Sequence, residues 1–338
     1  MAMSAEVKHR EHMKRRGDSN GKGKPTKSDS KENLGKKKEV KEDKSDQKGP
    51  KYGPLPKIPY QQVWARGVMI LGVIAVVYFS TKNNKEVALA RQKEILHQRA
   101  HDIPCSEDYK TEIKEFPGCV PERCGRLVSD KLVSASEADA LLNLAQRGLA
   151  LGGSDGGASI LDLHSGAISM GQGFVNVYQQ KKAANIFQKA DFTIYKVVKT
   201  KIQHAVAHHF GLDVKTLRLT HPTFFSRMTS LPPKTIHDEY WHPHVDKETY
   251  KSFHYTSLLY LTDYGRDFEG GRFIFIDQDK TNRTVEPRKG RVSMFTSGSE
   301  NVHFVERVTS GTRFALTVSF TCDPQYEIQD PSFHVADK

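Results

Sequence analysis

The chain has 338 residues, a formal net charge of +11 and four cysteines, with 37% hydrophobic and 27% charged residues. These proportions exclude a fibrous or wholly disordered chain and a disulfide-dense mini-scaffold, and the length fits one large or two modest domains with appendages. The charge is local, because residues 1–62 hold 17 Lys and Arg against 9 Asp and Glu, a net +8, which leaves +3 for the remainder. Net charge therefore does not indicate a nucleic-acid-binding domain.

The composition of residues 1–62 predicts a disordered basic tail, which we expect on the cytosolic side. Residues 1–59 contain Tyr52 as their single aromatic residue and few branched aliphatic ones, so ordering them would bury too little apolar surface to offset the lost entropy. Two basic runs, 14–16 and 36–38, fit either a polyanion-binding patch or a solvated tail with interspersed acidic residues. Aromatic residues are missing among the basic ones, which argues against a nucleic-acid partner.

Residues 63–81 predict a single transmembrane helix. Arg66 is the only charge among these 19 residues, and a span needs about 17 to 25 of them. Arg66 lies near the edge, where its side chain reaches the headgroups, and Trp64 and Tyr78 occupy interfacial positions. The alternatives are a buried core helix, which the preceding disordered tail disfavours, and a cleaved signal peptide, which the long preceding region disfavours.

The expected topology is that of a single-pass type II membrane protein, with the span as signal anchor and the C-terminal part in the lumen of the secretory pathway. Basic residues flanking the span are balanced, so only Arg66 and the long tail favour a cytosolic N-terminus. A sequon at Asn282 predicts a glycoprotein, with the sugar on an expected hairpin turn. All four cysteines follow the span and could form two disulfides in three pairings: Cys105, Cys119, Cys124 and Cys322.

Residues 82–123 are expected to form a stalk and Cys-bearing linker, with a helical stalk at 85–101, and residues 124–215 to hold supporting helices. A capping-box spacing from Ser134 to Glu137 predicts one helix start. Helical periodicity predicts a second helix from about 191 to 210, ended by Gly211. Between them, residues 151–173 contain seven glycines and predict a long mobile loop.

Residues 216–325 switch to the alternating pattern of strands, and residues 326–338 form a C-terminal tail. Several short strands with glycine turns and supporting helices predict an α+β fold, namely an antiparallel double-sheet jelly roll, or double-stranded β-helix, with helices on one side. The expected strands are 217–227, 257–262, 272–275, 291–295, 303–308 and 313–320.

One cluster of side chains carries chemistry. His244 and Asp246 are two apart, so on an extended strand both would leave the same face, and His303 opens an expected strand 59 residues later. Two imidazoles and one carboxylate form the facial triad of non-haem Fe(II) oxygenases. The alternatives are a polar cluster without metal and a structural zinc site, which the lack of cysteines disfavours.

Arg313 follows His303 by ten positions, across an expected turn at 309–312. In its strand, Arg313, Ala315, Thr317 and Ser319 share one face, and bulky apolar residues form the other. A small polar face with one fixed cation suits a cavity that binds a carboxylate in a bidentate manner.

The segments YWHPHVD, SLLYLTDY, EGGRFIF, VEPRKGRVSMF and HFVERVTSGTRFALTVSF resemble the 2-oxoglutarate/Fe(II) dioxygenases of the prolyl 4-hydroxylase type. The resemblance covers about residues 124–324. It implies that His244, Asp246 and His303 bind Fe(2+) and that Arg313 pairs with the distal carboxylate of 2-oxoglutarate. It further implies that Tyr260 contacts that carboxylate and that Thr317 lies behind the residues that contact the cosubstrate.

The resemblance implies an oxidoreductase: a membrane-anchored dioxygenase that uses O2, hydroxylates a protein or peptide side chain, with prolyl as one candidate, and converts 2-oxoglutarate to succinate and CO2. L-ascorbate is the implied reductant. The alternative is a catalytically silent binding or scaffold protein that keeps the fold. A nucleic-acid-directed oxygenase is disfavoured because the span separates the basic tail from the β part.

Two departures from the family pattern concern the substrate. Where the family usually has a tyrosine, residues 223–226 offer only Phe224 and Phe225. A loop at Met228–Glu239 precedes the triad, and we interpret it as a substrate lid, with a tolerated surface loop as the alternative. The sequence therefore leaves the substrate open.

Overall fold

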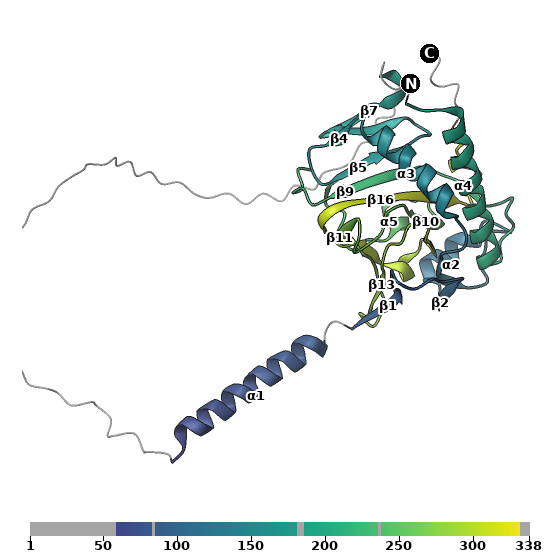
Figure 1. The fold of residues 1–338 in the computed structure, drawn as a ribbon. Helices are drawn as coiled ribbons and strands as arrows, with labels where there is room; N and C mark the ends of the chain where they lie inside the picture. The colour runs from purple at the N-terminus through teal and green to yellow at the C-terminus, as the bar shows by residue number, and fades with distance from the viewer. Residues whose placement is uncertain (1–58, 83–84, 181–185, 236–237, 332–338) are drawn as a thin grey trace, which may run out of the picture. The chain divides into compact units, whose positions relative to one another are not determined.

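The computed structural model describes residues 59–82, 85–180, 186–235 and 238–331 (Figure 1). Most of the predicted tail therefore lies outside the described residues. Helix α1 (Gln61–Lys82) contains the predicted span, and its residues Gln61–Phe79 are long and apolar enough to cross a membrane, with none of them buried. The helix is confirmed; that it crosses a membrane stays a prediction.

Two β-sheets make up the folded part, which confirms the α+β class with a large, mainly antiparallel sheet. The small sheet has the order β1 (Glu86–Ala90), β13 (Asn282–Val285), β12 (Phe273–Ile276), β15 (His303–Val305). The main path of the large sheet is β2 (Arg99–Ile103), β3 (Cys124–Ser129), β14 (Val292–Thr296), β10 (Tyr255–Tyr260), β16 (Val308–Thr321), β9 (Phe224–Thr229), β5 (Ala158–Leu161), β6 (Ala167–Gly171) and β4 (Gly153–Ser154). Off this path, β7 (Gly173–Asn176) pairs with β6, while β8 (Arg218–Leu219) and β11 (Phe268–Gly270) pair with β16.

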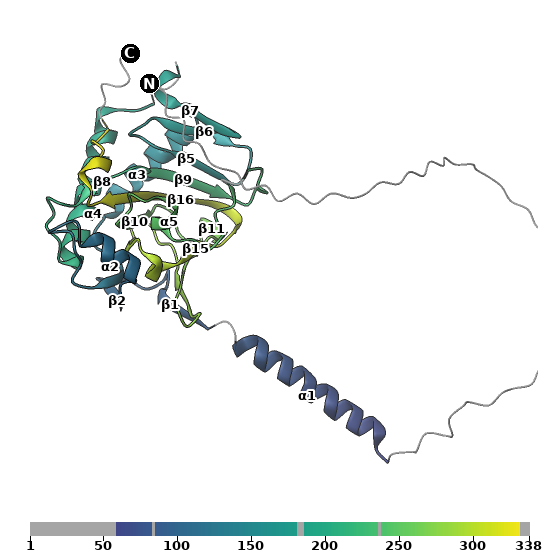
Figure 2. The ribbon, with the colours of Figure 1, turned by 180° about the vertical axis from the view of Figure 1, so that it is seen from behind.

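Side chains from the two faces of the large sheet enter different cores. Phe273, Phe275 and Val285 of the small sheet pack with Leu258 and Phe295 of the large sheet. The opposite face of the large sheet packs against helices α3 (Ala135–Leu149) and α4 (Lys189–Phe210), which Figures 1 and 2 show on one side of it. This two-sheet arrangement with helices on one side fits the predicted jelly roll.

The two supporting helices begin and end where their sequence indicates. Ser134 and Glu137 form a complete capping box ahead of α3, and α4 ends at Gly211, whose φ of 71° is left-handed. A left-handed residue at this position lets the backbone leave the helix while its amide still bonds to a helix carbonyl, and glycine adopts it without strain. Shorter helices are α2 (Glu107–Ile113), α5 (Asp246–Thr249) and the 3-10 turns Val177–Gln179, Ser299–Asn301 and Pro324–Tyr326.

Two predictions about the first half of the chain are wrong. The expected helical stalk at 85–101 is instead strand β1, a connecting turn and the start of β2. The apolar side chains Leu89 and Ala90 pack in the core of the small sheet, where β1 pairs in parallel with β13. The expected mobile loop at 151–173 contains β4, β5 and β6, because β5 pairs with β9 and extends the large sheet.

Strand boundaries in the second half differ at three places, one of which is the expected strand 303–308: β15 ends at Val305, and Val308 begins β16. The expected strand 217–227 is divided into β8 and β9, with a cis His221–Pro222 bond between them. The expected turn at 309–312 does not interrupt β16, because Phe268 and Glu269 of β11 pair with Gly311 and Ser310. Arg313 therefore lies inside a continuous strand.

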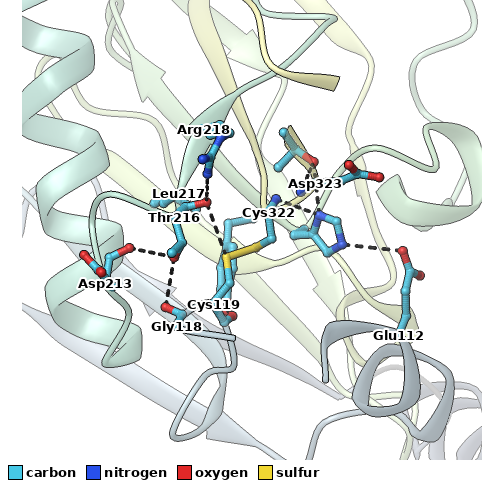
Figure 3. The surroundings of a disulfide bond; sticks show 12 residues. Glu112, Gly118, Cys119, Asp213, Thr216, Leu217, Arg218, Cys322 and Asp323 are labelled. Carbon is cyan, nitrogen blue, oxygen red and sulfur yellow. Dashed lines mark hydrogen bonds and ion pairs between the residues drawn. A yellow bond between two sulfur atoms is a disulfide. The ribbon is translucent and has the colours of Figure 1, made fainter. Parts of the chain in front are cut away.

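All four cysteines form disulfides, which selects one of the three pairings: Cys105–Cys124 and Cys119–Cys322. Figure 3 shows the second bridge joining the segment before β3 to the end of β16. Beside it, the Thr216 hydroxyl donates to the carbonyl of Gly118 at 3.0 Å. The predicted C-terminal tail is described only to residue 331, and there Asp330 pairs with Lys199 of α4 at 2.8 Å.

Candidate active site

The three predicted metal ligands come together. His303 is the first residue of β15, and His244 forms an isolated antiparallel bridge with it, with backbone bonds of 2.9 and 3.0 Å. Asp246 is the first residue of α5, and the backbone before it is extended at Val245, as the prediction that both side chains leave the same face requires. The extended Val245 between them leaves the side chains of His244 and Asp246 on the same side, and Figures 1 and 2 both show α5 beside β10.

The atoms of the triad lie at distances that suit one metal ion. Asp246 Oδ1 is 3.6 Å from His244 Nε2 and 3.5 Å from His303 Nε2. One ligand atom from each residue lies within 4.8 Å of the other two. Among the described residues this is the only group of three or more such side chains with this spacing. The set of two imidazoles and one carboxylate suits Fe(II).

Each ligand is held by a hydrogen bond of its own. His244 Nδ1 lies 2.9 Å from the carbonyl of His242, and His303 Nδ1 lies 2.8 Å from that of Asn301. A carbonyl only accepts, so both Nδ1 atoms carry the proton and leave the Nε2 lone pairs free. Asp246 Oδ2 accepts from the Thr256 hydroxyl at 2.6 Å, which leaves Oδ1 for a metal.

Electrostatics favour the ligand forms of two of these groups. Burial, with the neighbouring charge of His303, lowers the pKa of His244, which keeps its ring neutral. Burial alone would raise the pKa of Asp246, but the neighbouring His303 and the hydrogen bond from Thr256 hold it below its ordinary value, so the carboxylate stays ionised. Both shifts describe side chains ready to bind a cation.

Arg313 lies in β16 at the bottom of the same cavity. Its side chain is 1% exposed, Nε donates to the Gly271 carbonyl at 2.9 Å, and Nη2 has no hydrogen-bond partner among the described residues. The guanidinium carbon lies 5.5 Å from the centroid of the Tyr260 ring. The Tyr260 hydroxyl instead shares a hydrogen bond of 3.2 Å with Ser293. A buried cation with an unused N–H is suited to an anionic ligand.

A cavity of about 510 Å³ contains the triad and Arg313. Thr317 lines it, as the predicted polar face of β16 requires, whereas Phe314 and Leu316 of the other face pack in the helix-side core. Sequence reasoning missed the remaining lining residues, which come from separate elements and carry no motif. They include Ser226, Met228, Tyr240, Tyr250 and Phe253, together with Phe224 from the segment that lacks the family tyrosine.

Comparison with known proteins now identifies the family. Residues 234–321 match the model of the 2OG-Fe(II) oxygenase superfamily. The chain is 53% identical over 277 residues to 2-oxoglutarate and iron-dependent oxygenase domain-containing protein 3 of Xenopus tropicalis, an alignment covering 80% of this chain and 87% of that protein. The Homo sapiens protein of the same name is 49% identical over 282 residues, covering 81% and 88%.

The chain belongs to this family of 2-oxoglutarate and iron-dependent oxygenases. Among solved structures, a Pseudomonas putida prolyl-4-hydroxylase is similar, with 18% identity, a TM-score of 0.37 and coverage of 59% of this chain and 92% of that one. The family implies Fe(2+) and 2-oxoglutarate. The residues present fit both, because the triad supplies iron-type ligands and the unpartnered Nη2 of Arg313 points to an absent anion.

Two further predicted features have a place in the structure. The sequon does not lie on a hairpin turn as predicted, because Asn282 to Thr284 belong to β13; Asn282 is half-buried, and its backbone N–H donates to the Lys85 carbonyl at 2.7 Å. In the loop after β9, Asp238 is 1% exposed and accepts from the Ser154 hydroxyl at 2.7 Å and the Thr235 amide at 2.9 Å. The described part of the predicted lid is therefore fastened to the β4–β5 turn.

Proposed function

We propose that this chain is a membrane-anchored Fe(II)/2-oxoglutarate-dependent dioxygenase that hydroxylates a protein or peptide side chain, with prolyl as one candidate. His244, Asp246 and His303 bind Fe(2+) through Nε2, Oδ1 and Nε2. Arg313 binds the distal carboxylate of 2-oxoglutarate, with Tyr260 packed against the guanidinium and Thr317 lining the pocket. O2 is the oxidant, and L-ascorbate is the proposed reductant that keeps the iron ferrous.

When bound, iron and 2-oxoglutarate supply the oxidising chemistry that ends in succinate, CO2 and a hydroxylated product. The protein's own contribution is to hold the ligand side chains in place and to exclude water from the site. Asn301 and His242 fix the ring tautomers of the two histidines, and Thr256 fixes the carboxylate of Asp246. The buried face of Phe273, stacked at 5.0 Å on the His303 ring, keeps water from one side of the site.

One observation carries the proposal: three ligand side chains and a buried, half-satisfied arginine share one cavity. The alternative, a silent protein with the same fold that binds no anion, would not need a buried guanidinium with an unpaired Nη2, which is costly to keep. Such a group persists where a ligand uses it.

The test is cosubstrate turnover by the full-length chain in detergent, with Fe(II), ascorbate and 2-oxoglutarate labelled at C1. CO2 release above that of an Asp246→Ala variant is expected, with more release when peptide mixtures from secretory-pathway lysates are added. Equal release from both proteins under all conditions would refute the enzyme and leave the binding-protein alternative.

We further propose that α1 spans the membrane and that the folded part lies in the lumen. Support comes from the two disulfides, because such bridges form and persist in oxidising compartments. Glycosylation of Asn282 would report the same topology. A mobility shift on deglycosylation that disappears in Asn282→Gln is expected, whereas digestion of the folded part by protease outside intact vesicles would contradict it.

A further inference from the structure

Arg126 is a fully buried charge that the proposed chemistry does not use. It lies in β3, outside residues 234–321 that match the family model, and its side chain is 0% exposed. Removing a guanidinium from water costs several kcal/mol unless its partners are well placed. Its contacts therefore indicate what this strand contributes to the rest of the molecule.

The guanidinium of Arg126 makes three close contacts, besides a longer bond of 3.4 Å from Nη2 to the Glu300 carbonyl. Nε donates to Asn301 Oδ1 at 2.7 Å, and Nη1 donates to Asp277 Oδ1 at 2.7 Å. The guanidinium carbon lies 4.2 Å from the centroid of the Phe275 ring. A planar fork satisfies two acceptors in fixed directions while its face stacks on a ring, and the single ammonium of a lysine does not reproduce this arrangement.

Two of those three partners are immediate neighbours of the ligand His303. The carbonyl of Asn301 is the acceptor for His303 Nδ1 at 2.8 Å, and the Asn301 side chain is held again by donation to the Thr296 carbonyl at 2.8 Å. Phe275 is the cross-strand partner of His303, with ring centroids 6.0 Å apart. Arg126 thus contacts both the group that fixes the tautomer of His303 and part of the wall beside its ring.

The other histidine ligand lacks such support. His244 Nδ1 also bonds a carbonyl two residues earlier, that of His242, but the His242 side chain is 63% exposed and pairs only with Glu239 at 2.8 Å among the described residues. Buried reinforcement is therefore concentrated on His303, which is 3% exposed.

We propose that Arg126 is a positioning residue of the metal site. Through Asn301 it fixes the carbonyl that accepts from His303 Nδ1, and so it holds His303 Nε2 toward the metal. The inference rests on the proposed function, since it needs the triad to bind a metal. It makes β3, which precedes the matched oxygenase region in sequence, part of the metal site.

Arg291 is a matched control within the same protein. It too is 0% exposed, and its Nε and Nη2 donate to the two carboxylate oxygens of Asp130 at 2.7 and 2.9 Å. Its remaining bonds go to the carbonyls of Arg91, Glu286 and Glu94, and none of these groups contacts a triad residue in the described structure. Loss of Arg291 should destabilise the fold without moving His303.

The experiment measures Co(II) binding to the full-length chain in detergent, by calorimetry and by the visible absorption of the bound ion, without turnover. Arg126→Lys should weaken Co(II) binding about 10- to 100-fold and alter the spectrum, the range found when groups supporting a ligand are lost. Arg291→Lys should stay within about twofold of the wild type.

Asn301 provides a second, independent test of the same chain of contacts. Asn301→Ala removes the acceptor for Arg126 and should weaken Co(II) binding, whereas Asn301→Asp keeps that acceptor but loses the donation to Thr296, and should restore part of the binding. If Arg126→Lys does not fold, the comparison of Asn301→Ala with Asn301→Asp tests the positioning role in its place. Wild-type affinity in Arg126→Lys or Asn301→Ala, or an equal loss in Arg291→Lys, would overturn the positioning role alone. Failure of the wild type to bind Co(II) would overturn the proposed function with it.

Discussion

Replacing Arg313 with methionine should separate cosubstrate binding from stability. Within the described structure the buried guanidinium meets no carboxylate, and its one strong bond is from Nε to the Gly271 carbonyl. An uncompensated buried ion costs several kcal/mol, whereas the lost bond contributes about 1 to 2 kcal/mol. We therefore expect Arg313→Met to raise the free energy of unfolding by roughly 1 to 3 kcal/mol, or about 2 to 10 °C in Tm.

The same substitution should abolish the stabilisation of the folded protein by 2-oxoglutarate. Two charge-assisted bonds to a carboxylate contribute about 3 to 6 kcal/mol together, so their loss weakens binding by about 100-fold or more. For the wild type with Mn(II) in place of iron, cosubstrate at about 100 times Kd should add about 2.7 kcal/mol of stability. At that concentration Arg313→Met should show almost none of this gain.

The assay is thermal unfolding with and without 2-oxoglutarate, compared with Arg291→Met. That control removes a buried arginine that is paired with Asp130, and it should cost about 3 to 5 kcal/mol, the opposite sign. A ligand-induced shift retained in Arg313→Met would refute the carboxylate-binding role. A loss of more than about 2 kcal/mol in the absence of ligand would refute the energetic reasoning.

Three further outcomes are expected. Chemical denaturation should show that the free energy of unfolding falls by about 5 kcal/mol in Cys322→Ser and by about 3 kcal/mol in Cys105→Ser, because the Cys119–Cys322 bridge closes a span of 203 residues and the Cys105–Cys124 bridge only 19. Equal losses would contradict the chain-entropy argument. Ser134→Ala should lower Tm by a few degrees by removing a cap worth about 1 kcal/mol, and Glu137→Gln, which keeps a cap acceptor, should lower it less. Burial alone would raise the pKa of Asp238, but hydrogen bonds from Ser154 and the Thr235 backbone lower it from 3.8 to about 2. The contribution of Asp238 to stability is thus complete above pH 3.8 and is lost as pH falls through about 2. Asp238→Asn should increase proteolysis of the loop at neutral pH, whereas unchanged proteolysis would show that the carboxylate does not fasten the loop.

The features that the sequence alone predicts correctly depend on near neighbours. Ser134 and Glu137 are one turn apart, and Gly211 ends α4 through its own backbone. The two faces of β16 follow from strict alternation, so the cavity position of Arg313 and Thr317 needed no knowledge of the partner strands. Spacing and residue type likewise selected the three ligands, and the backbone between His244 and Asp246 is extended at Val245.

The predictions that failed concern segments whose structure is set by distant partners. Residues 85–101 contain good helix formers, yet β1 is a strand because β13, far along the chain, pairs with it. Glycine content at 151–173 indicated a loop, but β9 imposes a strand on β5. Thr256, Asn301 and Arg126 escaped notice for the same reason, since each acts only through contacts that folding creates.

The matched oxygenase region is therefore not a complete unit in this chain. Residues 234–321 contain all three ligands and Arg313, but β13 pairs with β1 on one edge and β14 pairs with β3. The Cys119–Cys322 bridge fastens the end of β16 to the segment before β3 (Figure 3), and Glu112 of α2 pairs with Lys247, next to Asp246, at 2.5 Å. Since these contacts support both the sheet and the residue beside Asp246, a fragment limited to the matched region would expose two strand edges and would lack Arg126, which contacts Asn301.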